Sequence, residues 1–139
     1  MARLKRAKAC LRIAGDDLLP EEITALLGAN PTWAQRKGQE FASRSPSGVR
    51  VVKFGQWRLE AEVTEPEDVN RQVSELLGQL SGDLAVWAAL SRRFEIDLFC
   101  GWFMSVTNEG LSISPDTLRA LGERGIELCL DIYSFVGDD

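Results

Sequence analysis

Histidine is absent from the 139-residue chain. This absence removes the commonest general base and the commonest metal ligand in proteins. It also excludes, within one chain, the Ser-His and Cys-His pairs in which histidine activates a nucleophile. The sequence therefore favours a protein that is not an enzyme.

Cysteine is scarce and occurs as an odd set of three, Cys10, Cys100 and Cys129, with no CxxC pair. Each cysteine falls in a segment predicted to be a strand, which favours buried, reduced thiols. The basic start of the chain, MARLKRAK, is not followed by the apolar stretch of a secretory signal. These features predict a cytoplasmic protein.

Long apolar runs are missing as well, because no stretch approaches the ~20 residues that a membrane-spanning helix needs. The net charge of −5 argues against nucleic acid and against an anionic membrane as partners. The chain is long enough to bury an ordinary hydrophobic core. We therefore expect one domain, residues 1–139, with no cofactor.

Residues 9–38 have the pattern of a strand, an acidic loop, a short helix and a second strand. Pro20 suits the first helical position, where its missing N–H costs nothing, and Gly28 is expected to end the helix. Residues 103–133 repeat this order, with Pro115 at the start of the helix. The sequence thus predicts two β-α-β units, which are candidates for an internal duplication.

The middle of the chain begins with a loop signal at residues 42–48. Residues 49–54 and 57–63 then predict two strands, since apolar and polar residues alternate in the second of them. The Gly55-Gln56 pair between them predicts either a tight hairpin turn or a bulge in one long strand.

Helix signals follow at Pro66 and at Asp83, a residue that can cap a second helical piece. Residues 96–106 form the most hydrophobic strand pattern and are predicted to lie at the centre of the sheet. The basic residues within 3–8 are typical of an edge strand, where charge discourages pairing with other sheets.

Strands with one apolar and one mixed face predict helices packed on one side of a mainly antiparallel sheet. The order of elements predicts an α+β domain built from ferredoxin-like β-α-β units. By alternation, the mixed face of the sheet would carry Cys10, Arg12, Arg58, Glu60, Glu62, Asp97, Phe99, Phe103, Cys129, Asp131 and Tyr133.

Three motifs occur in order over nearly the whole chain: GDDLLPEEITALLGANPTWAQRKG, WRLEAEV and LSISPDTLRALGERGIELCLDIY. Together they resemble the bacterial domain-of-unknown-function family numbered 4279. The resemblance implies a single-domain bacterial protein, and it supplies no activity and no catalytic residues. Leu19 departs from the pattern, since a polar helix cap such as Asp is expected at that position.

Two candidate sites lie in the first β-α-β unit. Asp16 and Asp17 are candidates for binding a hard cation such as Mg²⁺ or Ca²⁺, but the sequence favours their interaction with the positive end of the helix dipole. Trp33, Arg36 and Lys37 are candidates for an anion or acidic-peptide site. The alternative there is a strand end with one buried aromatic ring and solvated charges.

Asp131 and Tyr133, with Glu60 or Glu62 from across the sheet, are candidates for an acid/base pair. The alternative is ordinary cross-strand pairing of these carboxylates with arginine side chains.

The aromatic side chains Phe99, Phe103 and Tyr133 are predicted to share the mixed face of the sheet. Such a platform stacks RNA bases in some proteins, but the acidic composition favours a dimer interface or a partner surface here.

The leading hypothesis is a non-catalytic protein-interaction module, either of an inhibitor or immunity type or self-associating. It would bind a protein partner, or form a homodimer, through the mixed face. One alternative is a small-molecule or anion-binding domain around Trp33, Arg36 and Lys37. Another is a histidine-free, metal-dependent hydrolase that uses carboxylates.

Overall fold

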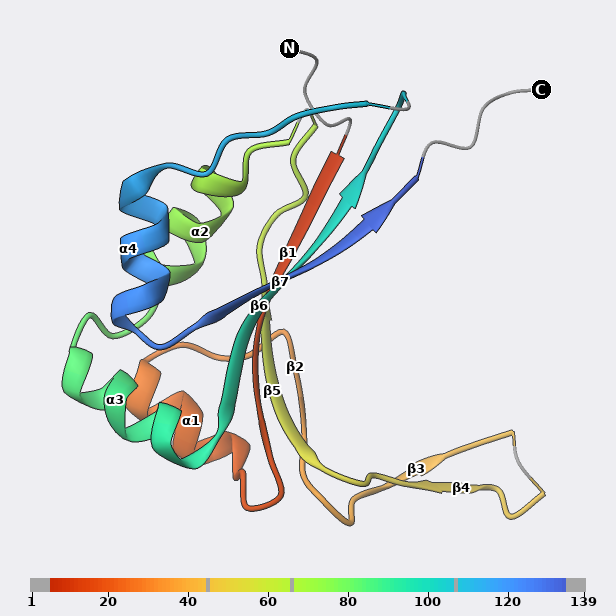
Figure 1. The fold of residues 1–139 in the computed structure, drawn as a ribbon. Helices are drawn as coiled ribbons and strands as arrows, with labels where there is room; N and C mark the ends of the chain where they lie inside the picture. Colours follow the sequence, from red (N-terminus) through yellow and green to blue (C-terminus); the bar gives the residue numbers. More distant parts are fainter. Residues whose placement is uncertain (1–5, 45, 66, 107, 135–139) are drawn as a thin grey trace.

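The computed structural model describes residues 6–44, 46–65, 67–106 and 108–134 (Figure 1). Within these ranges the elements are, in order, β1 (Arg6–Gly15), α1 (Pro20–Leu27), β2 (Trp33–Gln35), β3 (Glu40–Ala42), β4 (Val49–Val51), β5 (Gly55–Glu60), α2 (Val69–Gly78), α3 (Leu84–Arg93), β6 (Glu95–Phe103), α4 (Pro115–Glu123) and β7 (Glu127–Tyr133).

Five of the strands form one sheet in the order β2-β5-β1-β6-β7. All neighbours in it are antiparallel except β6 and β7, which are parallel. The helices lie on one side of the sheet, whereas β3 and β4 form a separate hairpin that projects away from them (Figure 1). The predicted α+β class, with a mainly antiparallel sheet and helices on one face, is confirmed.

β1 is the central strand, and it pairs with β5 on one side and β6 on the other. The prediction that residues 96–106 form the centre is therefore wrong, and so is the prediction of an edge for residues 6–8; residues 3–5 lie outside the described residues. Lys8 projects from the face of a central strand, where its charge reaches solvent without any free strand edge. The hydrophobicity of residues 96–106 does not distinguish β6 from the central strand of the sheet, because β6 lies next to β1 and is also paired on both sides.

The two predicted β-α-β units differ in their pairing. β6 and β7 pair directly, whereas β5 lies between β1 and β2. Since β1 and β2 both run antiparallel to β5, they run in the same direction as each other. This strand order does not establish the expected ferredoxin-like units, because one unit is split by an inserted strand and the other is not.

Gly55 is neither in a hairpin turn nor at a bulge, contrary to the sequence prediction. Residues 49–51 pair with β3, and Gly55 begins β5 opposite Gly15. A Cβ atom at Gly55 would lie 2.8 Å from the carbonyl oxygen of Gly15 and 3.0 Å from Leu18. Glycine is required here because these two segments approach each other closely. In the sequence, a glycine required for close packing looks the same as a glycine required for a turn.

The helix boundaries follow the capping residues. α1 begins at Pro20 and ends at Gly28, whose φ of 84° is the left-handed conformation that glycine adopts without strain. The side chains of Asp83 and Ser114 cap α3 and α4 by accepting hydrogen bonds from backbone N–H groups. The helix start expected at Pro66 lies outside the described residues, and α2 is capped by Asp68 instead.

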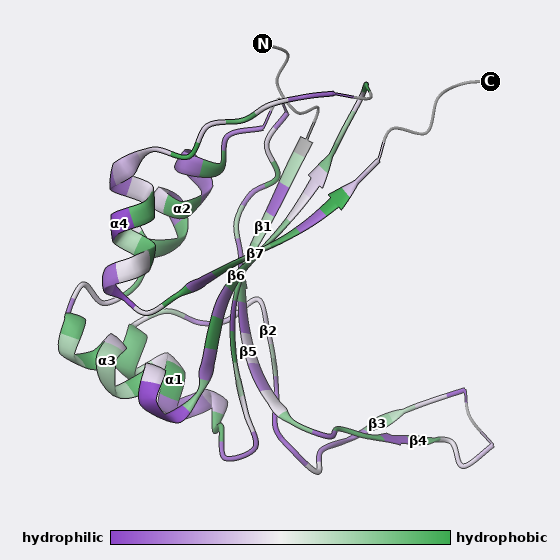
Figure 2. Cartoon of the chain, viewed as in Figure 1, coloured by the Kyte–Doolittle hydropathy of each residue, from purple (hydrophilic) through white to green (hydrophobic). Residues whose placement is uncertain are grey.

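The core lies between the sheet and the helices, and hydrophobic and hydrophilic residues alternate along the strands (Figure 2). Trp57 and Trp87 are both fully buried. The indole N–H of Trp57 donates to Thr24 Oγ1 at 3.1 Å, and that of Trp87 donates to the Ser81 carbonyl at 2.8 Å. Both polar atoms are therefore satisfied in the core. No described helix is long and apolar enough to cross a membrane.

A buried amide fastens α2 to the sheet. Gln72 is 1% exposed, and its Nε2 donates to the carbonyl oxygens of Ala7 at 2.8 Å and Glu62 at 3.1 Å. These bonds join the helix to β1 and to the chain that follows β5. The side chain thus satisfies backbone groups that helix packing removes from water.

Gln72→Leu is expected to lower the free energy of unfolding by about 1–3 kcal/mol, because it removes a donor from buried carbonyls. Denaturant unfolding of the two proteins measures the difference. Gln79→Leu is the matched control, since that exposed amide is bonded only within its own helical turn, and its cost should stay within about 0.5 kcal/mol. Equal stabilities of wild type and Gln72→Leu would contradict this role.

Candidate functional site

The sheet face that the helices leave uncovered, here called the open face, carries alternate side chains of four strands. The pairing places Arg12 between Arg58 and Asp97, and places Phe99 beside Cys129. Charged and aromatic groups are therefore neighbours throughout the surface. Its members are Lys8, Cys10, Arg12, Arg58, Glu60, Glu95, Asp97, Phe99, Phe103, Glu127, Cys129, Asp131 and Tyr133.

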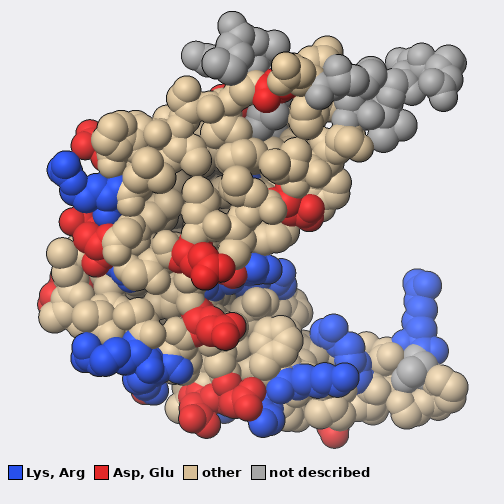
Figure 3. All heavy atoms as spheres, in the orientation of Figure 1, with Lys and Arg blue, Asp and Glu red and all other residues tan. Residues whose placement is uncertain are grey.

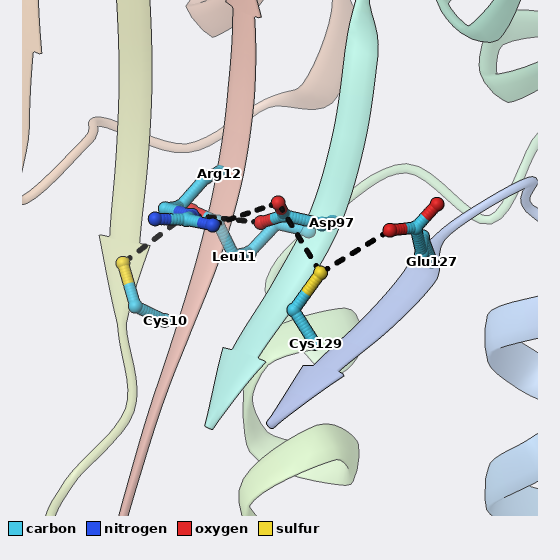
Figure 4. A network of polar contacts seen from close by, with 6 residues as sticks. All are labelled: Cys10, Leu11, Arg12, Asp97, Glu127 and Cys129. Atoms are coloured by element: carbon cyan, nitrogen blue, oxygen red, sulfur yellow. Dashed lines mark hydrogen bonds and ion pairs between the residues drawn. The ribbon is translucent and has the colours of Figure 1, made fainter. Parts of the chain in front are cut away.

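An ion pair between Arg12 and Asp97 occupies the middle of the open face (Figure 4). Arg12 Nε donates to Asp97 Oδ1 at 2.7 Å, and Arg12 Nη2 donates to Asp97 Oδ2 at 2.8 Å. The guanidinium carbon lies 4.4 Å from the centre of the Phe99 ring. Hydrogen bonding to Asp97 raises the pKa of Arg12 further. Two parallel bonds and a ring contact hold these three side chains in one arrangement.

Two cysteines flank this ion pair and are poor nucleophiles. Burial, followed by the charge of Glu60, raises the pKa of Cys10 to about 11. Desolvation, followed by a hydrogen bond to Glu127, raises the pKa of Cys129 to about 11. Cys129 Sγ donates to Glu127 Oε1 at 3.3 Å and contacts Asp97 Oδ2 at 3.7 Å (Figure 4). Both groups remain thiols near neutral pH, and a thiol attacks far more slowly than a thiolate.

Aromatic rings form one wall of a groove on the open face. Phe103 and Tyr133 stack with ring centres 4.6 Å apart and planes inclined by 3°. Lys8 Nζ lies 5.7 Å from the centre of the Phe103 ring. The groove has a volume of about 390 Å³, and Arg58 and Phe99 also line it. Its walls therefore combine ring surfaces with cationic groups.

Trp33 extends the open face to its β2 edge. The Trp33 ring centre lies 5.7 Å from that of Phe41 on the hairpin, and the Arg58 guanidinium lies 5.8 Å from the Trp33 ring. On the hairpin, Arg50 lies 5.5 Å from the Phe41 ring. Trp33 is 38% exposed, so the predicted buried aromatic is in fact a surface ring. These contacts continue the open face onto the hairpin.

Arg36 and Lys37 do not share a site with Trp33. Arg36 forms an ion pair with Glu21, and Lys37 Nζ lies 3.1 Å from Asp16 Oδ2. Both cations are thus neutralised by the acidic loop and helix start that precede them. This pairing leaves little net positive charge for the predicted anion site.

Of the two predicted cation ligands, one forms an ion pair and the other is exposed to solvent. Asp16 contacts Lys37, and Asp17 is an exposed neighbour in the same loop. Within the described ranges, no group of three or more His, Cys, Asp or Glu residues could hold a metal ion.

The structure separates Asp131 and Tyr133 from the carboxylates predicted to join them from across the sheet. Glu60 on β5 and Asp131 on β7 have two strands between them, a separation of roughly 14 Å at 4.8 Å per strand. A hydrogen bond with Asp131, together with its charge, raises the pKa of Tyr133. Glu62 lies beyond β5, where its backbone N–H donates to Glu75. Asp131 and Tyr133 are therefore in contact with each other, whereas Glu60 and Glu62 lie away from both.

In the comparison with protein families, a family described as a domain of unknown function, DUF4279, matches residues 5–135. The chain belongs to the DUF4279 family. No curated protein matches the sequence, and no solved structure matches the fold. The resemblance inferred from the three motifs is confirmed, and the family description carries no activity.

In this DUF4279 chain, Phe99, Phe103, Asp131 and Tyr133 lie together on the open face, as the alternation predicted. Their role in binding stays a prediction. Sequence reasoning missed the contribution of the hairpin residues Phe41 and Arg50. The β3 segment that holds Phe41 is only three residues long, so no alternation marked it as a strand.

The raised pKa values of the DUF4279 cysteines predict slow alkylation of the folded protein. At pH 8, raising a thiol pKa from 9.0 to about 11 lowers the thiolate fraction about a hundredfold. Iodoacetamide labelling followed by mass spectrometry should show slow modification of Cys10 and Cys129, accelerating as the pH rises toward 11. Unfolded protein is the control, and equal rates in the folded and unfolded states would contradict the assignment.

Proposed function

We propose that this protein is a non-catalytic protein-binding module that docks its partner on the open face. The observation that supports this most strongly is the groove itself, whose aromatic rings and cations lie on a sheet face without helical cover. An antiparallel sheet in a small domain ordinarily packs one face against the core and exposes polar side chains to solvent on the other face. Exposed rings on the solvated side are typical of surfaces that bind other molecules.

The chemistry of the groove indicates the kind of segment that it accepts. Lys8 and Arg58 line it, and neither forms an ion pair within the described part of the chain. Tyr133 is 46% exposed and offers both a ring face and a hydroxyl group. A partner segment that combines apolar side chains with carboxylates would contact the rings and neutralise the cations.

The central ion pair supports a binding role because it fixes the surface before a partner arrives. Arg12, Asp97 and Phe99 hold one another in place through two hydrogen bonds and a ring contact. A surface whose side chains are already ordered loses less conformational entropy on binding. An inhibitor or immunity-type role would use the same docking surface.

The other functions suggested by the sequence receive less support from the geometry. In the predicted anion site around Trp33, the positive charges of Arg36 and Lys37 are neutralised by ion pairs with Glu21 and Asp16. A metal-dependent carboxylate hydrolase would need a cluster of metal-binding side chains, and the described residues contain no group of three or more His, Cys, Asp or Glu that could hold a metal ion. The free thiols are consistent with the reducing conditions of the cytoplasm, where we place the interaction.

A photo-crosslinking amino acid at position 133 tests this proposal in living cells. We expect a discrete cross-linked adduct from position 133, because that side chain lies at the groove. The same group at position 118 is the matched control: Leu118 is 51% exposed, on α4, away from the open face. No adduct from position 133, or adducts of equal yield from both positions, would contradict the proposal.

A further inference from the structure

We infer that the partner is a second copy of this chain, docked open face to open face about a twofold axis. In this dimer the hairpin of each copy lies along β7 of the other. The inference rests on the proposed function and names the occupant of the docking surface. The hairpin with its connecting residues, 38–53, is called the arm below.

The arm is mostly basic, whereas the edge of the open face farthest from it is acidic. The arm carries three basic residues, Arg44, Arg50 and Lys53, and one acidic residue, Glu40. At the opposite edge of the sheet, β6 and β7 place four carboxylates on the open face, which are Glu95, Asp97, Glu127 and Asp131. Figure 3 shows basic side chains along the arm and acidic ones on the body beside the notch above the arm.

Local pairing leaves most of this charge available. Asp97 is paired with Arg12, but Glu127 and Asp131 form no ion pair within the described residues. On the arm, the same holds for Arg44, Arg50 and Lys53. The arm therefore stays basic, and β7 at the other edge of the sheet stays acidic.

Such a surface is complementary to itself. A twofold interface brings the same patch of both copies together, so each region of one copy meets a different region of the other. Rotation about an axis through the groove places the basic arm of one copy on the acidic β7 of its partner. The aromatic groove near the axis then meets its own equivalent, which buries the rings of both copies.

The arm has the exposure that this arrangement requires. Val49 and Val51 are 41% and 54% exposed. A two-stranded hairpin is only marginally stable alone, so a second copy that covers the arm would also stabilise it. Arg50 lies on the same arm face as Phe41, the residue that contacts Trp33.

Sedimentation equilibrium over a range of protein concentrations tests the inference, with two charge-reversed variants. Arg44→Glu/Arg50→Glu makes the arm acidic, and Glu127→Lys/Asp131→Lys makes β7 basic. Each variant places like charges at both arm contacts of the dimer, so its dissociation constant should rise at least about tenfold above that of wild type. The wild-type dimer should also weaken as salt is added.

Mixing the two variants should restore the dimer, because both arm contacts then join opposite charges. The control Arg71→Glu/Arg119→Glu makes the same change of net charge as the arm variant, but on exposed residues of α2 and α4, and it should associate like wild type. Circular dichroism and thermal melting confirm that each variant is folded. Restoration by mixing supports the twofold arrangement specifically, since a nonspecific charge effect would weaken the control as well.

A wild-type protein that stays monomeric at every concentration would overturn the inference. A dimer insensitive to both reversals, or a mixture that fails to associate, would overturn it too. The proposed function is tested separately. An adduct at position 133 that contains a different protein supports the docking surface and rejects only the second copy, whereas the absence of any adduct rejects the docking surface itself.

Discussion

The central position of β1 is the constraint on which the rest of the structure depends. Because β1 pairs with a strand on each side, the alternation of its side chains determines which residues face the core and which lie on the opposite face of the sheet. Ala7, Ala9, Leu11 and Ile13 are buried beneath the helices. The intervening side chains, Arg12 among them, must then project to the other side, where neighbouring strands supply their partners. One strand thereby separates the core from the open face.

The ion pair between Arg12 and Asp97 gives the open face its order and also limits its chemistry. It positions the Phe99 ring, and the carboxylate contacts Cys129. Burial and nearby negative charge keep the thiols protonated. We propose that the aromatic rings, the cations and the basic arm select the partner that docks on this surface.

Local chemistry made part of this structure predictable. Pro20, Gly28 and Ser114 marked helix ends because capping depends on residues close in sequence. Alternation identified the open face because successive strand side chains point to opposite sides. Strand order and the arm were not predictable, since they depend on pairing between distant segments. Likewise, nothing local to Arg36 indicates that Glu21 neutralises it.

Hydroxyl-radical footprinting of the wild-type protein at low and high concentration tests most directly whether the open face is a docking surface for a second copy. The account predicts that oxidation of Tyr133 and Trp33 falls as concentration rises, while oxidation of Leu118 on the helical side stays constant. Unchanged oxidation of Tyr133 and Trp33 across the range, or equal protection of Leu118, would contradict it.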